Sequence, residues 1–169
     1  MFLTGSNLVV ASGLMQKNSA SVGGAVSGYS SSITLTAGTI IDSNIGTVYG
    51  GGLFLYERFL ELVRSSIQGN TAKNGGGVAE MAASSITMSS GASVHQNTAA
   101  SFGAGLWLQD RCSLTTTQGS ISGNTAQEDG GGIYGDRYHQ FPAHSFCVSV
   151  TILRKIFRIE IRARYLHSR

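Results

Sequence analysis

Short runs in which apolar and polar residues alternate recur along most of the chain. Clear cases are SITLT at 32–36 and SITMS at 85–89, and CSLTT at 112–116 is a weaker one. Other short apolar runs, LFLY at 53–56 and LWLQ at 106–109, directly follow clusters of glycine. Such short alternating segments, bounded by turn-forming residues, are typical of β-strands. The pattern therefore predicts a chain built from many short strands.

These runs belong to an internal repeat that is marked by asparagine. The asparagines follow one another at steps of 26, 26, 27 and 27 residues, at Asn18, Asn44, Asn70, Asn97 and Asn124. Three residues before each lies an aliphatic residue or Met, namely Met15, Ile41, Ile67, Val94 and Ile121. A small residue stands two positions after each asparagine, and a cluster of glycines follows. A period in the twenties indicates a solenoid, in which each unit buries its apolar face against its neighbours.

Each unit has room for three short strands and no helix. The first follows the glycines, the second is the alternating run, and the third is the phrase that ends in asparagine. With three strands and three turns in about 26 residues, the chain must coil so that each strand pairs in parallel with its counterpart, ~4.8 Å along the axis. The predicted fold is an all-β parallel β-helix of about 26–27 residues per coil.

Asparagine suits the turn positions of such a coil for two reasons. It tolerates left-handed backbone angles, and its amide both donates and accepts hydrogen bonds. Stacked asparagines can therefore form a ladder along the axis, as they do in cross-β assemblies. The alternative, that each is an ordinary turn residue, is compatible with the same fold. The glycine clusters supply turns that side chains would obstruct.

The paired phrases, IxxN followed by GGG and an aliphatic residue, resemble the FxxN and GGA[ILV] repeats of chlamydial polymorphic outer membrane proteins. More broadly, they resemble right-handed parallel β-helices of the pectin-lyase-like superfamily. The resemblance covers residues 14 to 135, and GGA itself stands at Gly23-Gly24-Ala25. It implies a right-handed β-helix in a surface or secreted adhesin, or in a polysaccharide-processing enzyme. For an enzyme, the resemblance also implies a substrate cleft over the strand after the glycines. Both roles are implied by the resemblance alone, because a fold does not determine function.

Charge is unevenly distributed along the chain. The net charge is +3, yet residues 1–134 carry five Lys/Arg against seven Asp/Glu, whereas residues 135–169 carry seven against two. The basic character therefore belongs to the tail, and nucleic-acid binding is not expected for the repeat region. No apolar run approaches the ~20 residues that a membrane-spanning helix needs, and the first residues show no secretory signal.

The repeat divides the chain into residues 1–135, about four and a half coils, and a basic tail at 136–169. The first coil lacks a preceding glycine cluster, which predicts a fragment of a longer β-helix. Three interpretations of the tail remain open: a cap for the solenoid end, a basic segment for anionic surfaces, or sequence with no selected structure. Within it, residues 158–164 alternate as an amphipathic strand would.

One candidate site lies on the strand after the glycines. If Leu53, Val78, Leu106 and Ile133 face inward, the next residue of each coil faces outward, and acid and arginine pairs follow the strand ends in three coils. The resulting candidate ligand-binding face consists of Phe54, Trp107, Tyr134, Glu57, Arg58, Asp110, Arg111, Asp136 and Arg137. Aromatic and charged groups in one column are compatible with glycan binding. A solvated rim of neutralising charges and ordinary outward aromatics explains the same residues without a ligand.

The sequence predicts no cofactor and no metal site. His95 stands apart from the other histidines, which all lie in the tail, and no cluster of carboxylates suits calcium. Cys112 and Cys147 are too few for a disulfide framework; they either form one pair or act as unrelated small apolar residues. Glu80 falls at an inward position, which indicates a slip of register in that coil.

The expected function is a structural or adhesive module, at the cell surface or secreted, whose lateral face binds a polysaccharide or a surface protein. The alternative is a polysaccharide lyase or hydrolase that acts on the face around Trp107. Two carboxyl groups at ~5 Å or ~6.5–9.5 Å would be needed for glycosidase chemistry, and coils one or two steps apart provide such spacings.

Overall fold

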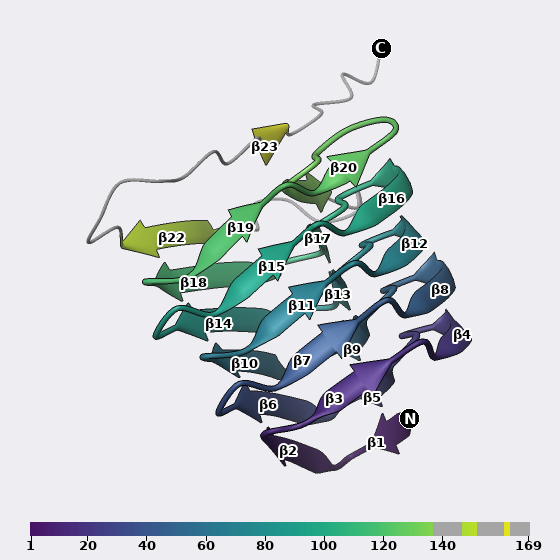
Figure 1. Ribbon diagram of the computed structural model, residues 1–169. Helices are drawn as coiled ribbons and strands as arrows, with labels where there is room; N and C mark the ends of the chain where they lie inside the picture. Colours follow the sequence, from purple (N-terminus) through teal and green to yellow (C-terminus); the bar gives the residue numbers. More distant parts are fainter. Residues whose placement is uncertain (137–146, 152–160, 163–169) are drawn as a thin grey trace.

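A computed structural model describes residues 1–136, 147–151 and 161–162, which form strands and turns and no helix. Accordingly, these residues include no helix that is long and apolar enough to cross a membrane. The chain winds through successive coils, and each strand pairs in parallel with the corresponding strand of the next coil (Figure 1). The structure is therefore a parallel β-solenoid, as the repeat predicted.

Four sheets run along the solenoid. The first contains β1 (Phe2–Thr4), β5 (Val26–Tyr29), β9 (Leu53–Tyr56), β13 (Val78–Met81), β17 (Leu106–Gln109), β21 (Ile133–Asp136) and β23 (Ile161–Arg162). The second contains β2 (Asn7–Ala11), β6 (Ser32–Thr36), β10 (Phe59–Val63), β14 (Ser85–Ser89), β18 (Ser113–Thr117) and β22 (Cys147–Thr151). The third contains β3 (Leu14–Gln16), β7 (Ile40–Asp42), β11 (Ser66–Gln68), β15 (Ser93–His95) and β19 (Ser120–Ser122). The fourth contains β4 (Ser19–Val22), β8 (Ile45–Tyr49), β12 (Thr71–Asn74), β16 (Thr98–Phe102) and β20 (Thr125–Ala126).

The fourth sheet corrects the prediction of three strands per coil. Each of its strands begins directly after a ladder asparagine, and the first four end just before a glycine cluster, whereas β20 ends at Ala126, before Gly130. Its inward positions carry only small residues, such as Gly46, Ala72 and Ala99, which pair in register. A Cβ added to Gly46 would lie 2.8 Å from the carbonyl oxygen of Tyr49, so the coil is too narrow here for larger side chains. The strand is thus present without the usual apolar alternation.

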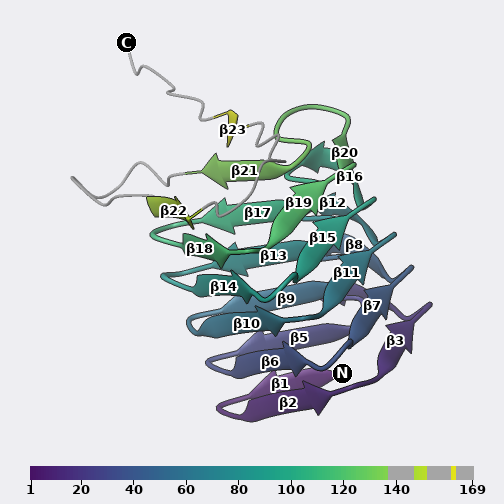
Figure 2. The same ribbon diagram turned by 60° about the vertical axis from the view of Figure 1, so that its left-hand side comes forward.

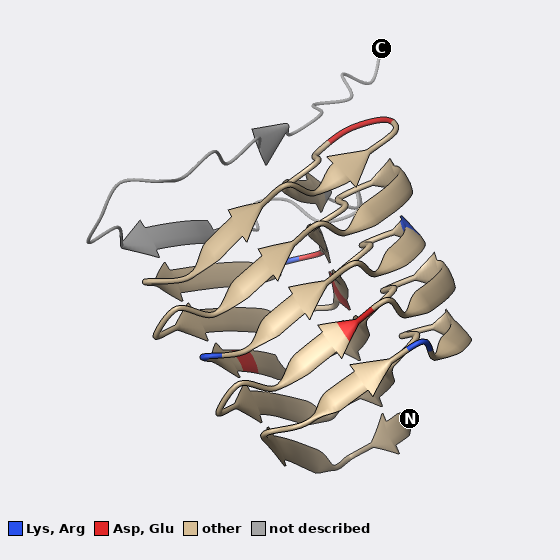
Figure 3. Ribbon diagram, viewed as in Figure 1, with Lys and Arg blue, Asp and Glu red and all other residues tan. Residues whose placement is uncertain are grey.

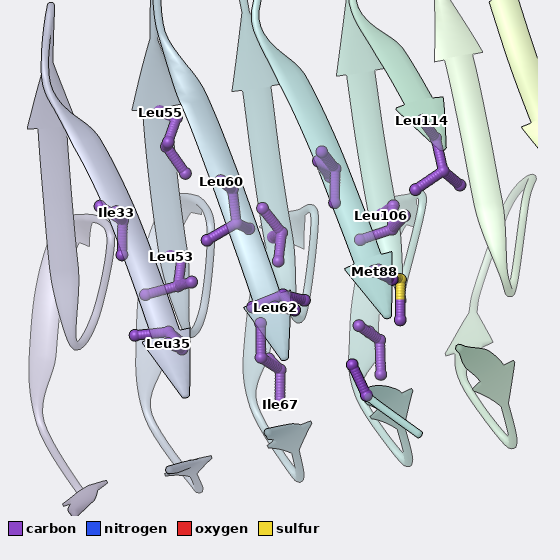
Figure 4. Close-up of a cluster of buried hydrophobic side chains, with 14 of the residues drawn as sticks. Ile33, Leu35, Leu53, Leu55, Leu60, Leu62, Ile67, Met88, Leu106 and Leu114 are labelled. Atoms are coloured by element: carbon purple, nitrogen blue, oxygen red, sulfur yellow. The ribbon is translucent and has the colours of Figure 1, made fainter. Parts of the chain in front are cut away.

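The interior is a long apolar column built by the other three sheets. Stacked leucine, isoleucine, valine and methionine side chains fill it, and Figure 4 shows Leu53 and Leu60 from facing strands pointing into the same space. Ile41, Ile67 and Val94 continue this core in the third sheet, and all three are fully buried. Burial at roughly 25 cal/mol per Å² of apolar surface is what holds successive coils together.

The glycine clusters form the turn into the first sheet. Gly50 has a φ of +63°, in the left-handed region that favours glycine. A Cβ on the next residue, Gly51, would overlap the backbone carbonyl of Gly76 in the following coil. The first glycine therefore allows the turn, and the second allows two turns to approach closely.

Two segments of the basic tail extend the sheets. β22 pairs with β18, and β23 pairs with β21 (Figure 2). Residues 137–146, 152–160 and 163–169 lie outside the described part, as does most of the amphipathic pattern at 158–164. The three interpretations of the tail stay predictions. Among the described residues, charged positions are scattered over the coils without a continuous stripe of either sign (Figure 3).

Candidate functional site

The first sheet alternates as the sequence indicated. Leu53, Val78, Leu106 and Ile133 belong to the main core. The next residues form an outer column of Phe2, Ser27, Phe54, Ala79, Trp107 and Tyr134, which pair in register from coil to coil. The expected column on the outward side of the first sheet is therefore present.

Phe54, Trp107 and Tyr134 of this column are covered by a second layer, which corrects the expectation that they form an exposed strip. Phe54 is 3% exposed, and Trp107 and Tyr134 are each 5% exposed. The last residues of fourth-sheet strands supply the cover: Tyr49 stacks on Trp107 with ring centroids 5.0 Å apart, and Phe102 stacks on Tyr134 at 4.7 Å. A ligand cannot reach these three rings from solvent in this conformation. An enzyme cleft centred on Trp107 is thereby disfavoured.

The acid and arginine pairs lie at the corner between the first and second sheets, although not in one column. Glu57, Asp110 and Arg111 all have left-handed φ values, of 61°, 52° and 60°. The ladder pairs Asp136 with Gln109, so Asp136 stands one position before the level of Asp110. Arg137 lies outside the described residues. Glu57 accepts a hydrogen bond from Ser30 Oγ at 3.3 Å, and Arg58 is exposed. The pairs are thus corner residues that do not all stand at the same position of the strand pairing.

A different set of aromatics is accessible on the same face. Phe2, Tyr29 and Tyr56, which we call the aromatic strip, lie in successive coils. The ring centroids of Phe2 and Tyr29 are 5.5 Å apart, and those of Tyr29 and Tyr56 are 5.9 Å apart. Phe2 is 68% exposed and Tyr56 is 36% exposed. The sequence reasoning missed the strip, although Tyr29 and Tyr56 occupy one repeat position.

A hollow of about 390 Å³ adjoins this strip at the level of Ser27. It is lined by Met1, Phe2, Ala20, Ser21, Val22, Gly23, Ser27 and Tyr29. The lining includes no charged side chain, and the amino group of Met1 donates a hydrogen bond to the carbonyl oxygen of Ala25 at 2.6 Å. The hollow is therefore a partly aromatic depression on the lateral face, and the charged group among its lining residues is the amino group of Met1.

The repeated asparagines form a continuous hydrogen-bonded ladder inside the turn. Asn70 is fully buried, and its Oδ1 accepts hydrogen bonds from the backbone N–H and the Nδ2 of Asn44, at 2.9 and 3.0 Å. Its own Nδ2 donates to the carbonyl oxygen of Ile41 and to Oδ1 of Asn97, both at 3.0 Å. Every donor and acceptor of the amide is thus used. The ladder is a structural element rather than a binding site.

The left-handed residue of this turn is the one before the asparagine. Positive φ values occur at Lys17, Ser43, Gly69, Gln96 and Gly123, whereas none of the ladder asparagines has one. Asparagine is therefore used here for its amide and not for its tolerance of left-handed angles.

A second stack, of hydroxyl and thiol groups, lies at the corner before the second sheet. Ser84 Oγ accepts from the backbone N–H of Arg58 at 3.4 Å and donates to the carbonyl oxygen of Met81 at 2.7 Å. In the next coil Cys112 Sγ donates to the carbonyl oxygen of Gln109 at 2.8 Å. Cys112 is a free, buried cysteine, and burial raises the pKa of its thiol to about 12. The side chain of Cys147 is not described.

Among the described residues, Glu80 is the one acidic or basic residue whose side chain is fully buried. It pairs in register with Leu55 and Leu108, so the coil shows no slip and the side chain truly points inward. Neither carboxyl oxygen has a hydrogen-bond partner, and burial raises the pKa of the carboxyl well above its usual value. Glu80 is therefore held as the neutral acid within an apolar column.

The geometry offers no centre for metal chemistry within the described ranges, where no group of three or more His, Cys, Asp and Glu could hold an ion. Among comparisons with known proteins, residues 118–136 match the model of the Chlamydia polymorphic membrane protein repeat. The match includes Asn124 and the glycines at 130–132. Neither the curated proteins nor the solved structures yield a match.

The fold and the repeat match together indicate a parallel β-solenoid with a repeat similar to that of Chlamydia polymorphic membrane proteins. The pectin-lyase-like superfamily and the right-handed sense of the solenoid stay predictions.

Proposed function

We propose that this chain is a structural or adhesive module of the cell surface, or a secreted one, whose lateral face binds a partner and carries out no catalysis. The observation that supports this proposal is the aromatic strip of Phe2, Tyr29 and Tyr56 on the outer side of the first sheet. Exposed aromatic side chains in contact with one another provide a large contact area at low entropic cost.

The rest of the solenoid fits a scaffold role. Its core and its ladder are continuous from coil to coil, so the sheets present long rigid faces. Rigid lateral surfaces are what solenoid proteins use for binding. A polysaccharide and a surface protein are both partners that such a strip accommodates, and Glu57 and Arg58 at the neighbouring corner supply polar contacts.

Binding of the fluorescent full chain to cultured eukaryotic cells tests the proposal. The expected result is saturable binding that falls at least about tenfold in a Tyr29→Ser, Tyr56→Ser variant, because the strip provides the central contacts. A matched control, Thr87→Ser with Thr115→Ser, changes two exposed positions of the second sheet and should bind as the unchanged chain does.

Two outcomes contradict the proposal: an absence of saturable binding, and equal binding by the strip variant. Incubation with polysaccharides, followed by a count of new chain ends, tests the enzyme alternative separately. Product formation that is lost in Asp110→Asn would replace the adhesive interpretation with the catalytic one.

A further inference from the structure

The aromatic strip contains the one ring contact between two tyrosines of the described part of the chain. Tyr29 and Tyr56 end successive strands of the first sheet and pair in register between β5 and β9. They therefore lie on the same face of neighbouring coils, with Cα atoms ~4.8 Å apart. Their ring centroids are 5.9 Å apart, and the ring planes meet at 31°. The backbone thus holds two phenols side by side.

The other two described tyrosines lie against rings of a different kind. Tyr49 stacks on Trp107 and also contacts Phe54, with ring centroids 5.0 and 6.3 Å apart. Tyr134 stacks on Phe102 and is only 5% exposed. Neither therefore has a described phenol as its stacking partner, which sets the pair in the strip apart.

Access from solvent is unequal within the pair. Tyr56 is 36% exposed, whereas Tyr29 is half-buried, and its ring centroid also lies 5.4 Å from that of Phe54. A reagent in solution therefore reaches Tyr56 first. Because the two rings are in contact, Tyr29 can pass an electron and a proton to an oxidised Tyr56. Both phenols can thus be oxidised through the outer one.

The separation of the two rings is close to that of a covalently joined pair. Two phenols bonded through the carbons beside their hydroxyl-bearing carbons have centroids nearer than 5.9 Å by about one C–C bond length. Small rotations of the side chains supply this approach, since χ2 of tyrosine has a broad minimum and Tyr56 has solvent on one side. The strands themselves can stay in place.

We propose that Tyr29 and Tyr56 are a modification site, at which hydrogen peroxide acting through a haem peroxidase joins the two rings by a carbon–carbon bond. Each phenol gives up one electron and its hydroxyl proton, and these two electrons and two protons reduce one hydrogen peroxide to two waters. The two phenoxyl radicals couple at the ring carbons beside the oxygens. The hydrogen on each of these carbons then moves to the oxygen of its own ring, which restores both phenols.

The bond ties two neighbouring coils together on the outer face of the first sheet. It closes a loop of one coil, which restricts the unfolded chain as a disulfide does. The product keeps both hydroxyl groups and both rings at the surface. This modification goes beyond the proposed function and is independent of it, because the bond forms whether or not a partner is bound.

The test uses the full chain with Tyr138→Phe and Tyr165→Phe, which removes the two tyrosines outside the described residues. A haem peroxidase and hydrogen peroxide are added, and the monomer is then isolated under denaturing conditions. A protease that cuts after Asp and Glu separates the two rings, because Asp42 lies between them. Mass spectrometry should find residues 1–42 joined to residues 43–57, with a mass lower than their sum by two hydrogen atoms.

Two conservative variants and one matched control make the result specific. Tyr56→Phe and Tyr29→Phe should each lower the yield of joined peptides at least about tenfold, because phenylalanine has no hydroxyl hydrogen to give up. Tyr49→Phe changes the other tyrosine of the same peptide and should leave the yield unchanged.

Dilution of the protein separates a bond within one chain from a bond between chains. The yield in the monomer should not depend on protein concentration, because the fold already holds the two rings together. The proposal is overturned if the monomer yields no joined peptides, if the joined peptides persist in Tyr56→Phe, or if they occur only in covalent dimers whose yield falls on dilution.

Discussion

Removal of one interior rung of the asparagine ladder should cost far more stability than removal of the first rung. Asn70→Ala eliminates four side-chain hydrogen bonds, two accepted by Oδ1 and two donated by Nδ2. At ~0.5–1.5 kcal/mol for each bond, the free energy of unfolding should fall by about 2–6 kcal/mol. The upper part of this range applies because the former partners, including the carbonyl oxygen of Ile41, stay buried without replacement in the turn.

Asn18→Ala is the matched control at the exposed start of the same ladder. Its Nδ2 makes two hydrogen bonds, to the carbonyl oxygen of Gln16 and to Oδ1 of Asn44, at 3.1 and 2.9 Å. Water can replace them at this exposed position, so we expect a loss of about 1 kcal/mol or less.

Urea unfolding, followed both by circular dichroism and by Trp107 fluorescence, measures the two costs. The two probes should report one transition before a free energy is assigned, because coils of a repeat array can unfold separately. Equal losses for Asn18→Ala and Asn70→Ala, or a loss below ~1 kcal/mol for Asn70→Ala, would refute the idea that a buried, fully bonded ladder holds the turns together.

Three further predictions concern buried side chains. Because burial raises the pKa of Glu80, the folded state holds its proton more tightly than the unfolded state, so stability should fall as the pH rises above about 4.5. Glu80→Leu should therefore stabilise by about 1–3 kcal/mol at pH 7, by an amount that shrinks toward pH 4, and urea midpoints with a pH-independent difference would contradict this. Cys112, with a pKa of about 12, should not react with a thiol reagent at pH 8 in a Cys147→Ser background until the protein unfolds; rapid labelling of the native state would show that it is accessible. Trp107 should emit at short wavelength and resist acrylamide quenching, and Tyr49→Ala should shift its emission to the red; equal quenching in both forms would place the indole outside the ring layer.

The sequence predicted the solenoid well because its signals repeat. Aliphatic residues three positions before each asparagine point into the core, and the asparagines themselves bond in register. The fourth strand could not be found in the same way, because its inward residues, such as Gly46 and Ala72, are small and produce no apolar alternation. A strand without a buried large side chain leaves little trace in a pattern of hydrophobicity.

The candidate site was harder to predict because the exposure of its side chains depends on the fourth strand of each coil, which the sequence pattern did not reveal. The alternation of β17 placed Trp107 outward, which was right for the sheet, yet Tyr49 from a distant coil covers it. Such a contact joins residues whose separation is more than two repeats, and no local pattern encodes it. The sequence analysis overlooked the accessible strip because Tyr29 and Tyr56, although they end corresponding strands, are not followed by the same charged residues.

The in-register stacking of coils is the claim on which the ladder, the covered column and the hollow all depend. A disulfide tests it most directly, in a background with Cys112→Ser and Cys147→Ser. Thr87 and Thr115 are exposed and pair between β14 and β18, so their Cα atoms should lie ~4.8 Å apart, within the range that a disulfide spans. Thr87→Cys with Thr115→Cys should therefore crosslink under mild oxidation. The offset pair, Thr87→Cys with Thr117→Cys, should not, because about 8 Å separates those positions. Equal crosslinking of both pairs, or crosslinking of the offset pair alone, would contradict the register and with it the solenoid described above.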